Sequence, residues 1–104
     1  LFPALDDSLK DPRGRESQNP EGLLQRAVRE LKKQAPELCV ITDVALDPYS
    51  SDGHDGIVRN GIIQNDESVE ALAQMAVTCA QDLSRGNASG RHAGSMREQP
   101  GARQ

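Results

Sequence analysis

Two stretches of the chain repeat apolar residues at the spacing of an α-helix. Asn19-Pro20-Glu21 precedes the first stretch and is typical of a helix start, and Pro36 ends it. Asn65-Asp66-Glu67 opens the second stretch. The predicted apolar face of the first helix consists of Leu23, Leu24, Ala27, Val28 and Leu31. That of the second consists of Val69, Leu72, Ala73, Ala76 and Ala80.

A short apolar run lies between the two predicted helices. Leu38 to Val44 is nearly continuous in apolar residues, which predicts a parallel strand covered on both faces. Further on, Ile57-Val58 and Ile62-Ile63 flank Asn60-Gly61, and this pattern predicts a small hairpin. A helix followed by a buried strand is half of a βαβ unit, so the chain is expected to have an α/β fold.

Charge and composition divide the 104-residue chain at about Gln81. Residues 1–81 carry eight basic and fourteen acidic groups, a net charge of −6, which argues against a nucleic-acid partner. Residues 82–104 hold four Arg, two acidic groups and few large apolar residues, so we expect this tail to be disordered. No run reaches the ~20 apolar residues of a membrane span. Cys39 and Cys79 are predicted to be reduced thiols in the core.

An acidic loop follows the predicted strand and is the best candidate for a functional site. Asp43, Asp47, Asp52 and Asp55 lie within thirteen residues, in a stretch rich in Gly and Pro. Carboxylates held this close repel one another unless a cation, a basic partner or a substrate offsets them. Two interpretations stay open at this point: a site for a cation such as Mg²⁺, or a turn-rich loop with solvated Asp caps.

Other kinds of site fit the loop less well. Its spacing departs from the EF-hand loop, and neither cysteine is near enough in sequence for a closed zinc site. His54, between Gly53 and Asp55, is expected to be an exposed loop residue, and Tyr49 a packing residue.

The segment from Asp43 to Val58 closely resembles the metal-site segment of porphobilinogen synthase, also called 5-aminolevulinate dehydratase. The resemblance covers residues 1–81. It extends to four further motifs: Leu1-Phe2-Pro3, Lys10 to Arg15, Asn19 to Leu23, and Asn65 to Val69. It implies that residues 1–81 are part of a TIM (β/α)8 barrel, about one to two strands and two helices, and that residues 82–104 lie outside the family pattern.

The resemblance also implies an activity, which is a lyase reaction that condenses two 5-aminolevulinate molecules into porphobilinogen for haem and chlorophyll synthesis. Zinc-using relatives hold their metal on three cysteines, and the matching positions here are Ala45, Asp47 and Asp55. Hard oxygen in place of sulfur suits Mg²⁺ rather than Zn²⁺. Asp47 and Asp55 are therefore expected to bind metal or the substrate amine, with Asp43 close to them. The stretch Ser50-Ser51-Asp52-Gly53 is more similar to the plastid form, which implies a protein of the plastid stroma, or alternatively of the bacterial cytoplasm. The family resemblance also implies a homo-octamer.

The chain also departs from the family pattern. A closed barrel takes ~250 residues, and the two Schiff-base lysines that the family uses have no match here, so no catalytic residue is predicted. The lysines present are Lys10, Lys32 and Lys33, all before the motif. The tail suggests a frameshift, a retained intron or a truncated transcript. The alternative function is a non-catalytic product that binds full-length subunits or a divalent cation. A lone piece of barrel is also expected to fold poorly by itself.

Overall fold

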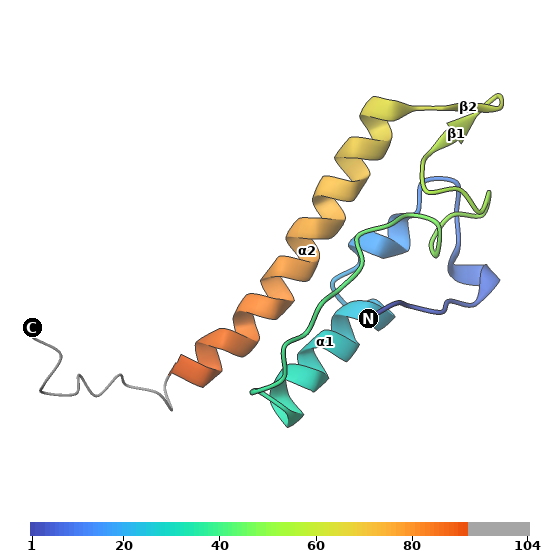
Figure 1. The fold of residues 1–104 in the computed structure, drawn as a ribbon. Coiled ribbons are helices and arrows are strands. Elements are labelled where there is room, and N and C mark those ends of the chain that lie inside the picture. The colour runs from blue at the N-terminus through green and yellow to red at the C-terminus, as the bar shows by residue number, and fades with distance from the viewer. Residues whose placement is uncertain (92–104) are drawn as a thin grey trace, which may run out of the picture.

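The computed structural model describes the backbone of residues 1–91 and the side chains of residues 1–84. Two helices run side by side in the same direction, and loops and a hairpin lie at one end of the pair (Figure 1). The elements in chain order are the 3₁₀ turns η1 (Asp7–Leu9) and η2 (Arg15–Gln18), helix α1 (Leu23–Gln34), strands β1 (Val58–Arg59) and β2 (Ile62–Ile63), and helix α2 (Asn65–Arg91).

Helix α1 begins a few residues later than its sequence signal. Gly22 is the N-cap, whereas the Asn19 side chain accepts a hydrogen bond from the Glu21 N–H at 3.0 Å and closes a turn before the helix. At the other end the Ala35 N–H donates to the Leu31 carbonyl, and Pro36 prevents another turn. Leu24 and Val28 lie in the core as predicted, but Leu23 is exposed.

The predicted buried face of α2 is largely wrong. The side chains that pack inward are Ser68, Ala71, Met75, Cys79 and Asp82, with Leu72 and Leu83 half-buried beside them. Val69, Ala73, Ala76 and Ala80 are exposed. The helix is apolar on two sides, so periodicity alone could not select the side that packs on α1. Met75 is 1% exposed and joins Leu24, Val28, Tyr49 and Cys79 in the main core.

The predicted strand from Leu38 to Val44 is extended backbone rather than a strand in a sheet. Among residues 1–91 its strand-like pairing is limited to Leu1, whose nitrogen donates to the Ile41 carbonyl at 2.7 Å and whose carbonyl accepts from the Asp43 N–H at 3.3 Å. This is the hydrogen-bond pattern of a parallel pair centred on Leu1 and Thr42. The prediction of a strand covered on both faces fails because the described residues supply no further neighbour for it. Leu38, Ile41 and Val44 are therefore exposed.

The hairpin prediction is confirmed. Val58 pairs with Ile63 and Arg59 with Ile62, and the turn between them is Asn60-Gly61. Both turn residues have positive φ, 51° and 74°, which is the backbone of a type I′ turn and explains this residue pair.

Helix α2 passes the predicted boundary at residue 81. It continues to Arg91, whereas the sequence led us to expect disorder from residue 82. Residues 92–104 lie outside the described part of the chain, so the expectation for them stays a prediction. Asp82 is 4% exposed and accepts a hydrogen bond from Arg29 at 3.1 Å. Arg29 also contacts the Pro20 carbonyl and Glu21, so this arginine joins the start of α1 to α2. None of the described helices is long and apolar enough to cross a membrane.

The two thiols differ in exposure, which corrects the prediction that both lie in the core. Cys39 is exposed on the extended segment, whereas Cys79 is buried between the helices. Burial raises the pKa of the Cys79 thiol, so less of it is the reactive thiolate at any given pH.

We therefore expect a thiol reagent such as DTNB to modify one cysteine about tenfold or more faster than the other at pH 8. Stopped-flow absorbance measures the two phases. Cys39→Ser should remove the fast phase and Cys79→Ser the slow one. Equal rates in the native chain would contradict this assignment, while in guanidinium the rates should converge.

Candidate functional site

Buried residues inside the acidic loop hold it against the rest of the molecule. Leu46 is 1% exposed and packs with Ile57 and Ala71, and Tyr49 reaches into the main core. Tyr49 N–H and Ser50 N–H both donate to the Leu46 carbonyl at 2.9 Å, which closes a tight turn over Asp47 and Pro48. The loop is thus ordered by apolar anchors and leaves its acidic side chains at the surface.

The loop after Leu1-Phe2 is clamped to the acidic loop by backbone hydrogen bonds. Asp11 N–H donates to the Tyr49 carbonyl at 3.2 Å, and Ser51 N–H donates to the Asp11 carbonyl at 3.1 Å. Gly14, at φ 60°, lies where an added Cβ would be 3.4 Å from both Leu46 and Tyr49. Loops that follow neighbouring parallel strands leave at the same edge of a sheet, which explains why these two segments meet.

Asp55 returns to the start of the loop. Its Oδ1 accepts a hydrogen bond from the Leu46 N–H at 2.6 Å, so its carboxylate lies beside the residue between positions 45 and 47. The fold thus brings position 55 close to the chain between positions 45 and 47, which are the other two positions that match the cysteines of the zinc-using relatives. Ala45 is buried and has no side-chain donor atom.

Asp47 is exposed and lines a cavity of about 340 Å³. The other residues that line it are Asp7, Lys10, Ser50, Ser51 and Gly53. Asp43 is also exposed, but it lies on the extended segment and is not among the residues of this cavity. The structure therefore gives the three predicted aspartates three different settings.

Lys10, Ser50 and Ser51 were not predicted as site residues. Lys10 begins one of the motifs shared with the family, but no local sequence pattern assigns it to the site, because it lies in a loop almost forty positions before Asp47. The signal that could have found it is topological: Leu1-Phe2 and Leu38-Val44 are both followed by long polar loops, and parallel strands place such loops together.

Tyr49 and His54 take the settings expected from sequence. Tyr49 is 2% exposed, and burial raises its pKa to about 12, so the phenol stays neutral near pH 7 and is unsuited to proton transfer there. His54 is exposed in the loop.

The donor set of the loop matches a hard cation in chemistry but does not complete a cage. Carboxylate oxygens from Asp47 and Asp55 are ligands that Mg²⁺ accepts, and Mg²⁺ usually keeps several waters beside one or two carboxylates. Within the described residues, no group of three or more His, Cys, Asp or Glu side chains is placed to hold a metal ion. A closed zinc site is not supported, because neither Cys39 nor Cys79 belongs to the loop.

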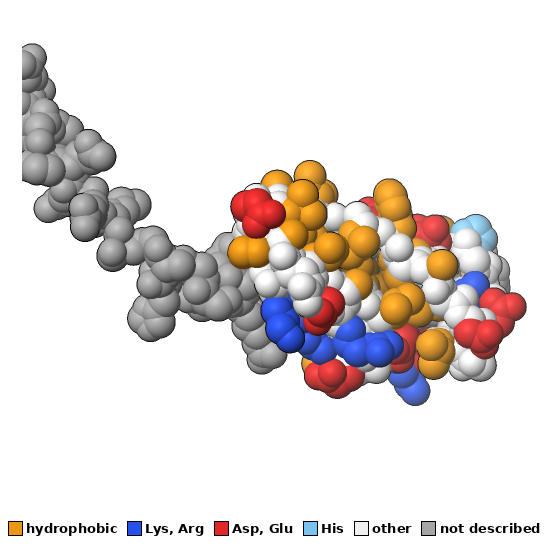
Figure 2. Space-filling model, turned by 90° about the horizontal axis from the view of Figure 1, so that it is seen from below, with side chains coloured by type: hydrophobic (Ala, Val, Ile, Leu, Met, Phe, Trp, Pro, Cys, Tyr) orange, Lys and Arg blue, Asp and Glu red, His pale blue; other side chains and the backbone are white. Residues whose placement is uncertain are grey.

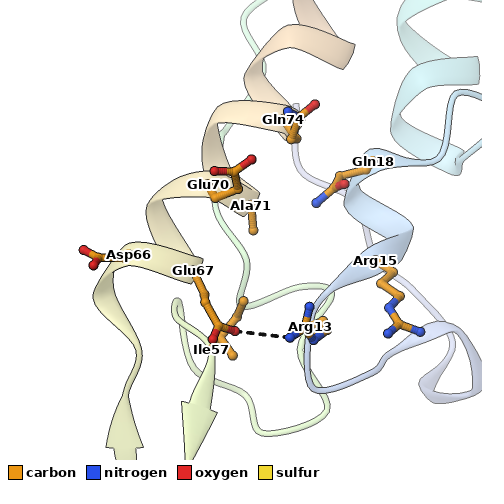
Figure 3. Close-up of a pocket in the computed structure, with 9 residues that line it drawn as sticks. All are labelled: Arg13, Arg15, Gln18, Ile57, Asp66, Glu67, Glu70, Ala71 and Gln74. Atoms are coloured by element: carbon orange, nitrogen blue, oxygen red, sulfur yellow. Dashed lines mark hydrogen bonds and ion pairs between the residues drawn. The ribbon is translucent and has the colours of Figure 1, made fainter.

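A second cavity, of about 700 Å³, lies between η2 and the first turns of α2 (Figure 3). Arg13 and Arg15 face it from one side, and Glu67 and Glu70 from the other (Figure 3). Arg13 pairs with Glu67 at 3.3 Å, and Arg59 holds the same carboxylate through two hydrogen bonds. None of the three predicted aspartates lines this cavity, so it is separate from the acidic loop.

Known proteins resemble this chain over nearly all of its described length. The family model for delta-aminolevulinic acid dehydratase matches residues 1–84. The chloroplastic delta-aminolevulinic acid dehydratase of Selaginella martensii is 57% identical over 82 residues, which are 78% of this chain and 20% of that protein. The delta-aminolevulinic acid dehydratase of Bradyrhizobium diazoefficiens is 49% identical over 81 residues, 78% of this chain and 23% of that protein.

A solved structure also superposes on the fold. It is the delta-aminolevulinic acid dehydratase (porphobilinogen synthase) of Toxoplasma gondii in complex with the reaction product porphobilinogen, with a TM-score of 0.77 and 50% sequence identity. The match covers 79% of this chain and 24% of that one. An ordered acidic loop at the end of an extended segment, with parallel helices beside it, is thus one portion of a larger α/β enzyme fold.

The chain belongs to the delta-aminolevulinic acid dehydratase family, whose members are also called porphobilinogen synthases. It spans about a fifth of the length of the curated relatives it matches. The family match extends to residue 84, three residues past the boundary expected from the sequence. It therefore includes Asp82 and its contact with Arg29.

Proposed function

We propose that residues 1–84 supply the acidic strand-end loop of a magnesium-type porphobilinogen synthase, in which Asp47 and Asp55 bind Mg²⁺ or the amino group of 5-aminolevulinate. The observation that carries this proposal is the hydrogen bond from the Leu46 N–H to Asp55 Oδ1, at 2.6 Å, which brings position 55 back to the residue between positions 45 and 47. In the intact protein the reaction is the condensation of two 5-aminolevulinate molecules to porphobilinogen.

The roles of the residues follow from their settings. Asp47 is free to turn toward a ligand, while Asp55 has one oxygen committed to the Leu46 N–H and a second oxygen available. Mg²⁺ bound there would offset the negative charge of the loop and orient substrate oxygen or nitrogen atoms. Asp43 supports the start of the loop, since its N–H pairs with Leu1.

The plastid stroma is the proposed location, because several similar relatives are named chloroplastic. A homo-octamer is the proposed assembly.

A chimera tests this function in a complete barrel. Residues 1–84 of this chain replace the matched stretch of the Selaginella martensii dehydratase, and porphobilinogen formation is measured colorimetrically. We expect the chimera to be active and the double variant Asp47→Asn with Asp55→Asn to lose about tenfold or more in rate. Asp52→Asn is the matched control, because it removes a carboxylate from the same loop at a position without a counterpart among the three family ligands. Equal rates for the two sets of variants would contradict the proposal.

A second candidate function is association with barrel subunits. The extended segment presents exposed Leu38, Ile41 and Val44, and within the described part of the chain its strand-like pairing involves Leu1 alone. Such an edge recruits another strand. Apolar side chains are exposed over much of one face of the molecule (Figure 2).

We expect the tagged chain to co-purify with the complete Selaginella martensii enzyme when the two are expressed together. The variant Ile41→Lys should abolish this, whereas Val77→Lys, on the exposed side of α2, should not. Retention of Ile41→Lys on the complex would reject the edge as the contact.

A further inference from the structure

Lys10 is the basic side chain among the residues that share a cavity with Asp47. We infer that Lys10 is a built-in counter-ion of Asp47 and so lowers the affinity of the acidic loop for a divalent cation, which makes it an affinity-setting residue. The inference rests on the proposed function, in that it takes Asp47 as a cation ligand.

The position of Lys10 is fixed from one side by η1. Its ammonium lies 2.9 Å from Asp7 Oδ1, and its N–H donates to the Asp7 carbonyl at 3.1 Å. Asp6 caps the same turn by accepting from the Ser8 N–H at 2.9 Å. The Lys10 side chain is 28% exposed, so most of its length lies against the protein.

The next residue fixes Lys10 from the other side. Asp11 exchanges two backbone hydrogen bonds with the Tyr49–Ser51 stretch, and these bonds hold the two loops in register. Lys10 and Asp47 are therefore kept at one cavity by the backbone and not by a flexible side-chain contact. Because backbone hydrogen bonds hold the two loops together, Lys10 would stay at the cavity of Asp47 when a cation binds there.

The charges around the cavity decide what Lys10 does there. Asp7 and Asp47 each bring one negative charge and Lys10 one positive charge, a net of −1, while Ser50 and Ser51 are neutral. Asp7 is 95% exposed, so its ion pair with Lys10 is weak and leaves the ammonium able to turn toward Asp47. A divalent cation arriving at Asp47 meets a positive charge, which opposes binding by Coulomb repulsion.

The test uses the complete 104-residue chain and Mg²⁺ alone, followed by NMR of the backbone amides of Ser50 to Asp55. We expect Lys10→Met to bind Mg²⁺ about fivefold more tightly than the wild-type chain at low salt, with the difference shrinking at ~0.5 M NaCl. Lys10→Arg keeps the charge and should match the wild type. Lys33→Met, an exposed lysine on α1, is the control for a general loss of positive charge.

Each result decides the matter. Tighter binding by Lys10→Met alone supports the inference. Equal or weaker binding by Lys10→Met, an equal gain in Lys33→Met, or no Mg²⁺ binding by any variant overturns it. Asp47→Asn separates this from the proposed function: if it weakens Mg²⁺ binding while Lys10→Met has no effect, the site stands and the counter-ion role fails. Slow hydrogen exchange of the Asp11 and Ser51 amides in the metal-free variants verifies that the clamp is intact.

Discussion

The purified 104-residue chain is expected to form no porphobilinogen from 5-aminolevulinate. The family reaction that the resemblance implies uses Schiff-base lysines, and a lysine amine attacks a carbonyl only after losing its proton, which requires a desolvated pocket or a neighbouring cation. Lys10 is ion-paired with Asp7, Lys32 donates to the Leu38 carbonyl at 3.5 Å, and Lys33 is exposed. None of the three lysines has the surroundings that a nucleophile needs. We therefore expect the isolated chain to have no porphobilinogen synthase activity at all, rather than a reduced activity.

Two measurements check this expectation. The colorimetric assay for porphobilinogen should stay at the level of the no-protein blank, and the active chimera carrying the same residues 1–84 serves as the positive control. Borohydride reduction in the presence of 5-aminolevulinate, followed by mass spectrometry, should show no covalent adduct on the chain. Product above the blank, or an adduct on any of the three lysines, would show that this segment contains a nucleophile that its structure does not reveal.

Local sequence signals predicted those elements that local interactions determine. The Asn60-Gly61 turn needs only its own two positive φ angles, and Pro36 ends α1 through a missing N–H. The two helices were predicted for the same reason. The core position of Tyr49 was also predicted from the sequence, because an aromatic ring next to Pro48 was expected to pack against apolar residues.

Features that depend on partners elsewhere were not predictable in this way. The apolar run from Leu38 to Val44 carries the pattern of a strand between two neighbours, but the described residues supply only Leu1 as a partner. The exposure of Cys39 has the same cause, because it lies in that run. The apolar pattern of this segment is thus that of a strand with more neighbours than the described residues provide. This agrees with a chain that spans about a fifth of the length of its relatives.

The candidate site divides along the same line. The assignment of Asp47 and Asp55 to a metal or substrate site came from family resemblance and stays a prediction. The structure adds that the Leu46 N–H donates to Asp55, nine residues further along the chain. Lys10 was missed because its approach to Asp47 depends on the Asp11–Ser50 bridge, a contact between loops far apart in the chain. The aspartates of the loop are visible in the sequence, whereas the lysine that shares a cavity with Asp47 is found only in the tertiary fold.

Met75→Ala is expected to destabilise the chain by about 3 kcal/mol, because it removes a large side chain from the packed core and leaves a cavity. Met75 is 1% exposed and packs with Leu24, Val28, Tyr49 and Cys79. The free energy of unfolding is measured by urea titration with circular dichroism at 222 nm, after the wild-type chain is shown to unfold cooperatively. A loss of this size is a large part of the total stability of so small a domain.

Val77→Ala is the matched control, since Val77 lies on the same helix and is 52% exposed. We expect it to change the free energy of unfolding by less than about 0.5 kcal/mol. The comparison decides which of the two apolar sides of α2 packs on α1, the question that periodicity left open. A larger loss for Val77→Ala than for Met75→Ala would mean that α2 is rotated in solution, with the Val69, Ala73 and Ala76 side turned inward. If the two variants lost stability equally, both sides would be buried, and the chain would have to associate in solution through the face that is exposed here.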